Sequence, residues 1–107
     1  MEVKNISISE SEWKIMNVLW EKPELTLREI AASLKESDWS YTTIRTLVTR
    51  LVEKGAIAAD KSSSNFRYSP AVPEGECKRK EVNRLLSRVF EGSVSMLVST
   101  LAKDSNL

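Results

Sequence analysis

Two short apolar repeats on either side of a polar turn, between Thr26 and Gly55, constrain the fold of this chain most. In each repeat, apolar residues recur at the i, i+3, i+4 and i+7 spacing that is typical of one buried helix face. Two packed helices with one outward polar face indicate a helix-turn-helix, whose second helix enters the major groove of DNA. The first repeat is Leu27, Ile30, Ala31 and Leu34, and the second is Ile44, Leu47, Val48, Leu51 and Val52.

Capping residues stand at the ends of these expected helices. Thr26 and Glu29 have the spacing of a capping box, in which each side chain accepts a hydrogen bond from the other residue's backbone N–H. Ser40 can cap the second helix, and Gly55 stands where a glycine in left-handed conformation commonly ends a helix. The sequence therefore predicts a helix from Thr26, a turn over residues 36–39 and a recognition helix that ends at Gly55.

An earlier helix and a later hairpin flank this pair. Ser9 and Glu12 form a second capping box at the start of the earlier helix, which Pro23 ends. After the recognition helix, residues 57–61 and 66–68 are predicted as strands, joined by a turn over residues 62–65. Pro70 and Pro73 are expected to close this hairpin and to begin a linker. A hairpin directly after a recognition helix is typical of a winged helix, in which the hairpin tip lies beside the phosphate backbone.

Two further amphipathic helices are expected beyond the linker, separated by Gly92 and Ser93. Their apolar stripes expose more apolar area than a monomer tolerates, so this segment needs a partner surface. A second copy related by two-fold symmetry is the simplest partner, and folding back onto the N-terminal domain is the alternative. The stripes are Val82, Leu85, Leu86, Val89 and Phe90, then Val94, Leu97, Val98, Leu101 and Ala102.

The predicted fold class is therefore mainly α with a small β-hairpin wing. We expect a winged helix-turn-helix DNA-binding domain over residues 1–72 and a helical dimerisation segment over residues 73–107. A homodimer is expected, with an interface that includes Leu85, Leu86, Val89, Leu97 and Leu101.

The composition excludes several classes of protein. The 107 residues include one cysteine and no histidine, so a disulfide framework and a metal site are not expected, and no cofactor is predicted. No apolar run reaches the length of a membrane span and no signal peptide is present, so a cytoplasmic protein without membrane contact is expected. Residues 40–67 carry a net charge of +3, against +1 for the whole chain, which indicates a modest basic patch. Its basic residues are Arg45, Arg50, Lys54, Lys61 and Arg67.

The outward face of the expected recognition helix is rich in threonine and arginine. A threonine methyl group can contact the thymine methyl group and its hydroxyl can bond a base edge, whereas arginine binds guanine or a phosphate. The alternative is a solvated helix face, which is disfavoured because threonine is a poor helix former. When the apolar stripe faces inward, helical geometry turns outward Thr42, Thr46, Thr49 and Arg50, which Thr43 and Arg45 flank.

Residues beside this face have alternative interpretations. Trp39 is either core filler or a phosphate contact through its indole N–H, and we expect its ring to be half buried. The hairpin residues from Lys61 to Arg67 form either a simple polar turn or a nonspecific contact with phosphate, which their donors suit. Arg28, on the outer face of the second helix, is expected only to be solvated, and Cys77 is expected to have no functional role.

An enzymatic function is not supported by the residue types present. No histidine is available as a general base, and no glycine-rich phosphate loop occurs in the sequence. No carboxylate cluster is expected in a pocket, since Glu12 is explained by helix capping. The chain is therefore not expected to be an enzyme.

Three stretches of the chain together resemble one known family of regulators. They are ISESEWKIMNVLWEK at residues 8–22, LREIAASLKESDWSYTTIRTLVTRLVEKGAI at residues 27–57 and FRYSP at residues 66–70. These stretches are similar to the penicillinase, methicillin-resistance and copper-transport repressors, the BlaI/MecI/CopY family. The resemblance runs from about Ile8 to Leu101, and its most specific parts are residues 12–20 and 38–55.

This resemblance implies a homodimeric winged-helix repressor that binds double-stranded operator DNA with inverted repeats of the TACA/TGTA type. It implies base contacts from Thr42, Thr43 and Thr46, and backbone contacts near Trp39, Tyr41, Arg50 and the wing. Taken with the residues singled out above, the expected DNA-binding set is Trp39, Tyr41, Thr42, Thr43, Arg45, Thr46, Arg50, Lys61 and Arg67.

The branches of this family imply different inducers. In the β-lactam branch, a sensor protease inactivates the repressor by cutting a helix near its C-terminus, and an ungapped match places that cut between Thr100 and Leu101. The copper branch ends in a cysteine-rich tail that binds Cu(I), which this chain lacks. The chain stops at Leu107, before the usual final helix of the family, so the expected dimerisation segment is shorter than usual.

The expected function is therefore the repression of β-lactam-resistance-type genes, with release by proteolysis. One alternative is a copper-responsive repressor without its cysteine tail, and another is a winged-helix interaction module that does not bind DNA. A steep loss of operator affinity with salt would separate both repressors from the interaction module.

Overall fold

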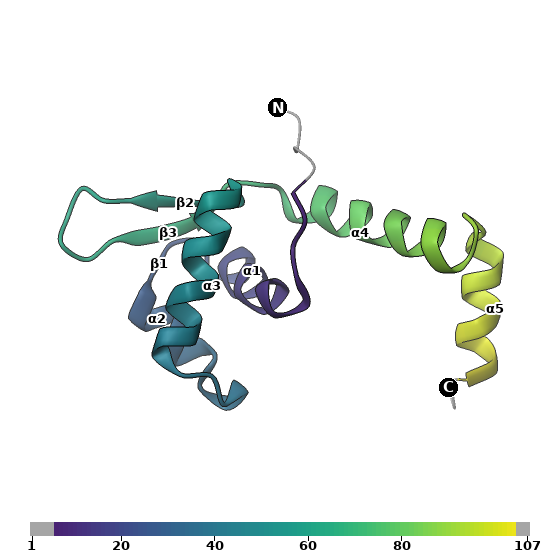
Figure 1. Cartoon of the computed structure of the whole chain (residues 1–107), viewed down its shortest axis with the longest axis horizontal. Coiled ribbons are helices and arrows are strands. Elements are labelled where there is room, and N and C mark those ends of the chain that lie inside the picture. Colours follow the sequence, from purple (N-terminus) through teal and green to yellow (C-terminus); the bar gives the residue numbers. More distant parts are fainter. Residues whose placement is uncertain (1–5, 105–107) are drawn as a thin grey trace. The chain divides into compact units, whose positions relative to one another are not determined.

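The computed structural model describes residues 6–104 and divides the chain into two compact units, Met1–Pro73 and Glu74–Leu107. The described part of the first unit contains helices α1, α2 and α3, a 3-10 helix and a small antiparallel sheet (Figure 1). The second unit contains helices α4 and α5.

Helix α1 (Glu10–Glu21) begins at the predicted capping box. The Ser9 hydroxyl oxygen accepts a hydrogen bond from the Glu12 N–H at 3.2 Å, and Glu12 Oε1 accepts one from the Ser9 N–H at 2.9 Å. The inner face of the helix is fully buried at Ile15, Met16 and Leu19. The helix ends shortly before Pro23, in keeping with the poor helical tolerance of residues that precede proline.

Helices α2 (Leu27–Ser33) and α3 (Tyr41–Lys54) form the predicted helix pair. The Thr26–Glu29 capping box opens α2, and the Ser40 hydroxyl accepts a hydrogen bond from an N–H in the first turn of α3. The 3-10 helix η1 (Lys35–Ser37) connects the two helices. Gly55 ends α3 with a φ of 85°, a left-handed conformation in which any Cβ is strained, so the predicted glycine stop is confirmed.

The sheet contains one strand more than the predicted hairpin. Strands β2 (Ile57–Asp60) and β3 (Arg67–Pro70) are antiparallel, with Ala58 opposite Ser69. Strand β1 (Leu25–Thr26) pairs with the other edge of β3, so the strand order is β1-β3-β2. A two-residue strand is too short to show an alternating pattern, which explains why the sequence did not reveal it.

The predicted strand ends were displaced by one or two residues. The first strand stops at Asp60 rather than at residue 61, and the second spans residues 67–70 rather than 66–68. Pro70 was expected to close the hairpin, but it is the last residue of β3, opposite Ile57. A proline is tolerated there because a terminal strand position does not require its missing N–H.

The core of the first unit lies where its three α-helices meet one another and the sheet. Helix α1 contacts α2, α3 and β3, and α3 also contacts α2 and β2. The hairpin β2–β3 follows α3 directly and projects from the helices (Figure 1). This arrangement is a winged helix, as predicted. Its largest fully buried apolar side chains are Ile15, Met16, Leu19, Ile30, Ile44, Val48 and Leu51.

A buried ion pair joins the start of α1 to the end of α3. Glu12 is only 1% exposed, and its Oε1 accepts a short hydrogen bond from Lys54 Nζ, which also donates to the Ser7 carbonyl at 2.7 Å. Lys54 was counted in the basic segment of residues 40–67, but its charge is directed at Glu12, so it adds less to that patch than expected. The capping box explains only part of the role of Glu12.

The second unit contains α4 (Glu74–Val89) and α5 (Val94–Asp104), whose axes differ by 84°. As predicted, Gly92 and Ser93 separate them: Gly92 has a φ of 82°, and the Ser93 hydroxyl accepts a hydrogen bond from the Met96 N–H at 3.2 Å. Among the described residues, no single helix is long and apolar enough to span a membrane. Taken together, the bent α4–α5 pair has the length and composition of a membrane span, by these two criteria only.

The apolar residues of the second unit differ in exposure. Leu86 is 8% exposed, and Leu85 and Leu97 are half buried, so these three offer less free surface to a partner than expected. The physical reason is that the chain's own atoms already cover them. The large apolar side chains that remain exposed are Val82, Val89, Val94, Met96, Val98 and Leu101.

Candidate nucleic-acid interface

The polar face of α3 is exposed along its whole length, as helical geometry predicted. Ile44, Leu47, Val48 and Leu51 are buried on the opposite side of the same helix. The exposed set comprises Tyr41, Thr42, Thr43, Arg45, Thr46, Thr49 and Arg50.

Two of the threonine hydroxyls on this face already have local hydrogen-bond partners. Thr46 Oγ1 donates to the Thr42 carbonyl at 3.0 Å, and the hydroxyls of Thr43 and Ser40 share a hydrogen bond of 3.0 Å. A hydroxyl that donates to its own helix keeps its lone pairs and its neighbouring methyl group for an outside partner. Thr46 therefore presents a methyl group and an acceptor, but no free hydroxyl hydrogen.

Trp39 and Lys14 form one border of this face. Trp39, just before α3, is half buried as predicted. Lys14 Nζ, from α1, lies 5.1 Å from the centroid of the Trp39 ring, within the range of a cation–π contact. Lys14 was not singled out from the sequence, because nothing in its local pattern indicates that α1 reaches the start of α3.

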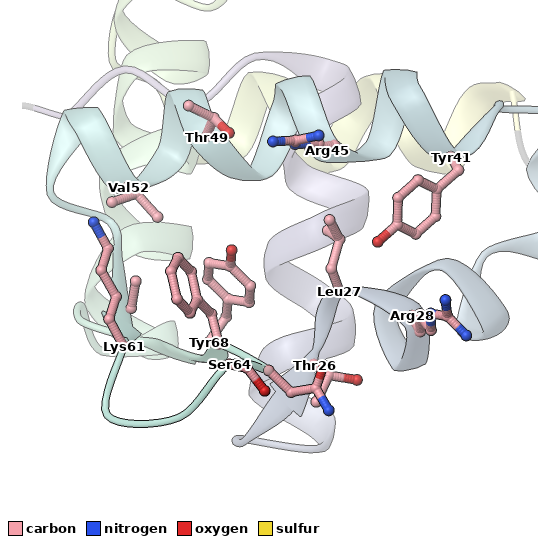
Figure 2. A pocket seen from close by; sticks show the side chains of 13 residues that line it. Thr26, Leu27, Arg28, Tyr41, Arg45, Thr49, Val52, Lys61, Ser64 and Tyr68 are labelled. Carbon is pink, nitrogen blue, oxygen red and sulfur yellow. The ribbon is translucent and has the colours of Figure 1, made fainter.

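A hollow of about 430 Å³ forms the other border, between α3, the start of α2 and the wing (Figure 2). Tyr41, Arg45 and Thr49 enter it from α3, Arg28 from α2 and Lys61 from the wing. Arg28 is exposed, as expected for a solvated side chain, and the fold also places it at the edge of the hollow. The remaining lining residues are Thr26, Leu27, Val52, Ala59, Ser64, Asn65, Phe66 and Tyr68.

The hollow is electropositive. Its lining includes Arg28, Arg45 and Lys61 but no aspartate or glutamate. Lys61 Nζ lies 5.6 Å from the centroid of the Phe66 ring, a contact that holds the ammonium group beside the hollow. A surface that holds cations, phenol hydroxyls and an amide, and that contains no carboxylate, attracts anions.

The wing turn is fixed by Asp60, at the end of β2. Asp60 Oδ1 accepts a hydrogen bond from the Ser62 N–H at 2.9 Å, and this bond holds the pKa of Asp60 below its usual value. Arg67 lies opposite Asp60 in the sheet, and its charge also helps to lower the pKa values of Asp60 and Glu29. Arg67 is exposed but is not among the residues that line the hollow, whereas Lys61 is.

The described residues contain no group of three or more metal-binding side chains. Cys77 is buried, and burial raises the pKa of its thiol, which makes the thiolate less available.

Comparisons with known proteins agree with this geometry. Residues 8–107 match the family model described as penicillinase repressor. The methicillin resistance regulatory protein MecI of Staphylococcus aureus (strain N315) is 34% identical over 108 residues, which cover 100% of this chain and 88% of that protein.

Two solved structures share this fold. The DNA-binding domain of the repressor BlaI, solved in solution, has a TM-score of 0.61 and 32% identity, covering 70% of this chain and 93% of that chain. The monomeric form of Bacillus licheniformis BlaI in complex with the blaP half-operator has a TM-score of 0.57 and 32% identity, covering 65% of this chain and 87% of that chain. The resemblance inferred from the sequence motifs is thus confirmed, and the chain belongs to the penicillinase repressor family.

Proposed function

We propose that this chain is a transcriptional repressor that binds an inverted-repeat operator as a homodimer and controls genes of the β-lactam-resistance type. The observation that carries the proposal is the exposed threonine and arginine face of α3, bordered by cations on both sides. It is supported by the relative named as a methicillin resistance regulator and by the BlaI complex with a half-operator. Action in the cytoplasm, on an operator of the TACA/TGTA type, belongs to the same proposal.

Base reading is assigned to the first turns of α3, and backbone binding to its borders. Thr42, Thr43 and Thr46 are exposed near the N-terminal end of the helix, which in a helix-turn-helix points into the major groove. Arg45 and Arg50 flank these threonines. The backbone contacts are assigned to Trp39, Tyr41, Arg45, Arg50, Lys61 and Arg67.

Thr46→Ala is expected to weaken operator binding by about 1–2 kcal/mol, since one base-edge contact contributes about that much discrimination. Thr46→Val is expected to retain most of the affinity, because the Thr46 hydroxyl hydrogen already bonds the Thr42 carbonyl and the methyl group makes the contact. The measurement is the dissociation constant for operator and scrambled duplexes at one salt concentration.

The two Thr46 variants are matched controls for each other. Both should bind the scrambled duplex as the wild type does, because nonspecific binding depends on phosphate contacts. A valine variant as weak as the alanine variant would assign the contact to the hydroxyl oxygen. Unchanged operator affinity in both variants would contradict the placement of Thr46 in the groove.

Dimerisation is assigned to the second unit. Val94, Val98 and Leu101 lie at the i, i+4 and i+7 positions of α5 and are all exposed, so they form one apolar stripe. Val89 at the end of α4 is also exposed, and a second copy of the chain would cover these side chains. Leu85, Leu86 and Leu97, which are less exposed, would then pack behind the side chains that contact the second copy.

Release is assigned to proteolysis by a sensor protease between Thr100 and Leu101. Leu101 is 60% exposed and belongs to the α5 stripe, so the cut removes an apolar side chain from the proposed interface. The bond lies within a regular helix, where Thr100 Oγ1 donates to the Met96 carbonyl at 2.9 Å. The protease would therefore have to unwind the last turns of α5 to bind an extended substrate.

A chain that ends at Thr100 is expected to dimerise more weakly than the full chain. Each subunit loses one leucine from the interface, which forfeits roughly 1.5–3 kcal/mol per fully buried side chain. Sedimentation and operator titration of both chains provide the measurement. Equal dimerisation and equal operator binding would show that cleavage at this bond is not the switch.

The direct test of repression is transcription in vitro from a promoter that overlaps a TACA/TGTA dyad. Adding the protein should reduce the run-off transcript, and a scrambled dyad in the same promoter should abolish that reduction. Equal transcription from both promoters, at protein concentrations that saturate the dyad in a binding assay, would contradict a repressor function.

A further inference from the structure

The hollow beside α3 has cations at its two ends. Figure 2 shows Lys61 of the wing at one end and Arg28 of α2 at the other, with Arg45 and Thr49 on the α3 wall between them. Tyr41 lies at the end that holds Arg28, and its phenol group points into the hollow toward Leu27 (Figure 2). The cations thus come from three different elements and surround one elongated space.

Arg28 is an exposed cation in the first turn of α2. The start of this helix is already capped by Thr26 and already carries the Glu29 carboxylate, so the helix start itself needs no further anion. None of the ion pairs between described side chains involves Arg28, and no carboxylate lines the hollow. An external anion would therefore pair with the guanidinium group itself.

A DNA strand fits these requirements better than a single small anion does. With α3 in the major groove, a sugar–phosphate backbone must run along the side of the helix that faces the wing. That backbone carries one negative charge per 3.4 Å of helix axis, so several phosphates pass through the space at once. A series of separated cations with hydroxyl and amide donors between them matches such a series of charges.

We propose that this hollow is a channel for one strand of the operator backbone, and that Arg28 binds a phosphate at the end opposite Lys61. The inference rests on the proposed function and adds a contact from α2 to those assigned to α3 and the wing. Arg28 grips the backbone without reading a base. Its contribution is therefore equal on every duplex and fixes how far α3 is rotated in the groove.

The test compares Arg28→Gln with the wild-type full chain. One lost phosphate contact lowers the slope of log affinity against log salt by about 0.9, which corresponds to a loss of about fivefold at 0.15 M salt. The loss should be the same for operator and scrambled duplexes. Arg28→Lys should restore the slope, and Arg79→Gln, which removes an exposed charge from α4, should leave it unchanged.

Duplexes with a single neutral methylphosphonate locate the contact. One position should weaken wild-type binding about fivefold yet have no effect on Arg28→Gln, and a different position should behave in this way for Lys61→Gln. An unchanged slope in Arg28→Gln, without any position that couples to it, would overturn the channel. Failure of the proposed function would look different, because the wild type would then bind operator and scrambled duplexes equally.

Discussion

Val98→Asp is expected to convert a dimeric protein into monomers and to reduce operator affinity by at least about 100-fold. Val98 is 57% exposed in α5 and lies in the middle of the stripe that Val94 and Leu101 continue. In a two-fold dimer the substitution occurs twice, and each copy buries an unpaired charge where an apolar side chain was covered. A loss of 2.8 kcal/mol already corresponds to 100-fold in the dissociation constant. The monomers then bind the two half-sites independently, so the second half-site no longer gains from the high effective concentration of a linked subunit.

Ser99→Asp is the matched control, because Ser99 is the exposed neighbour of Val98 on a different face of α5. This variant should remain dimeric and bind the operator as the wild type does. Leu97 is a poorer probe, because it is half buried within the chain and its substitution would also disturb the second unit. A wild type that sediments as a monomer at micromolar concentration with operator present would contradict the dimer.

Lys54→Met is expected to lower the free energy of unfolding by about 2–3 kcal/mol. Removing one partner of a buried ion pair typically costs about 3–5 kcal/mol. We expect a smaller cost here because the Lys54 side chain is about one-third exposed. Without Lys54, the buried Glu12 carboxylate loses its cationic partner and is left with hydrogen bonding from Ser9. Urea unfolding followed by tryptophan fluorescence gives the measurement.

Two further variants test whether the charge of Glu12 causes this loss. Glu12→Gln combined with Lys54→Met should recover part of the stability, because an amide caps the helix without a buried charge. Arg84→Gln, which breaks the exposed Arg84–Glu81 pair of 3.3 Å, should cost less than about 0.5 kcal/mol. If Lys54→Met lowered the free energy of unfolding as little as Arg84→Gln does, the buried pair would not be a main source of stability.

The same ion pair predicts a dependence of stability on pH. Burial alone would raise the pKa of Glu12, but the hydrogen bond and charge of Lys54 and the Ser9 N–H outweigh burial and lower it below 4.5. Since the pKa is lower in the folded state, the pair stabilises fully above the unfolded pKa and loses its effect as the pH falls through the folded pKa. The difference between wild type and Lys54→Met should therefore shrink below about pH 4.5. A constant difference from pH 7 to pH 3 would contradict this assignment.

The parts of the fold that depend on local pattern were predictable from the sequence. Both capping boxes, the Gly55 stop and the buried stripe of α3 follow from residue type and spacing over one or two helix turns. The winged helix followed from the order of these elements. Strand β1 was not predicted because it forms only by pairing with β3, which is far away in the sequence.

In the candidate site too, features set by local sequence were predictable and features set by contacts between elements were not. The exposed threonines and Trp39 were placed correctly because they belong to α3 and its start, whose geometry is local. The surroundings of Lys54 and Arg28 could not be predicted because they depend on other elements, namely Glu12 of α1 and the hollow formed with α3 and the wing.

The central claim is that α3 reads an operator while the surrounding cations hold its backbone. The most direct measurement is the affinity of the full chain for a TACA/TGTA dyad and for a scrambled duplex between 0.05 and 0.2 M salt. We expect the dyad to be preferred by at least about 10³-fold and the affinity for both duplexes to fall by at least about 10³ over this range, since a dimer makes six or more phosphate contacts. Equal affinity for both duplexes, or affinity that does not change with salt, would contradict it.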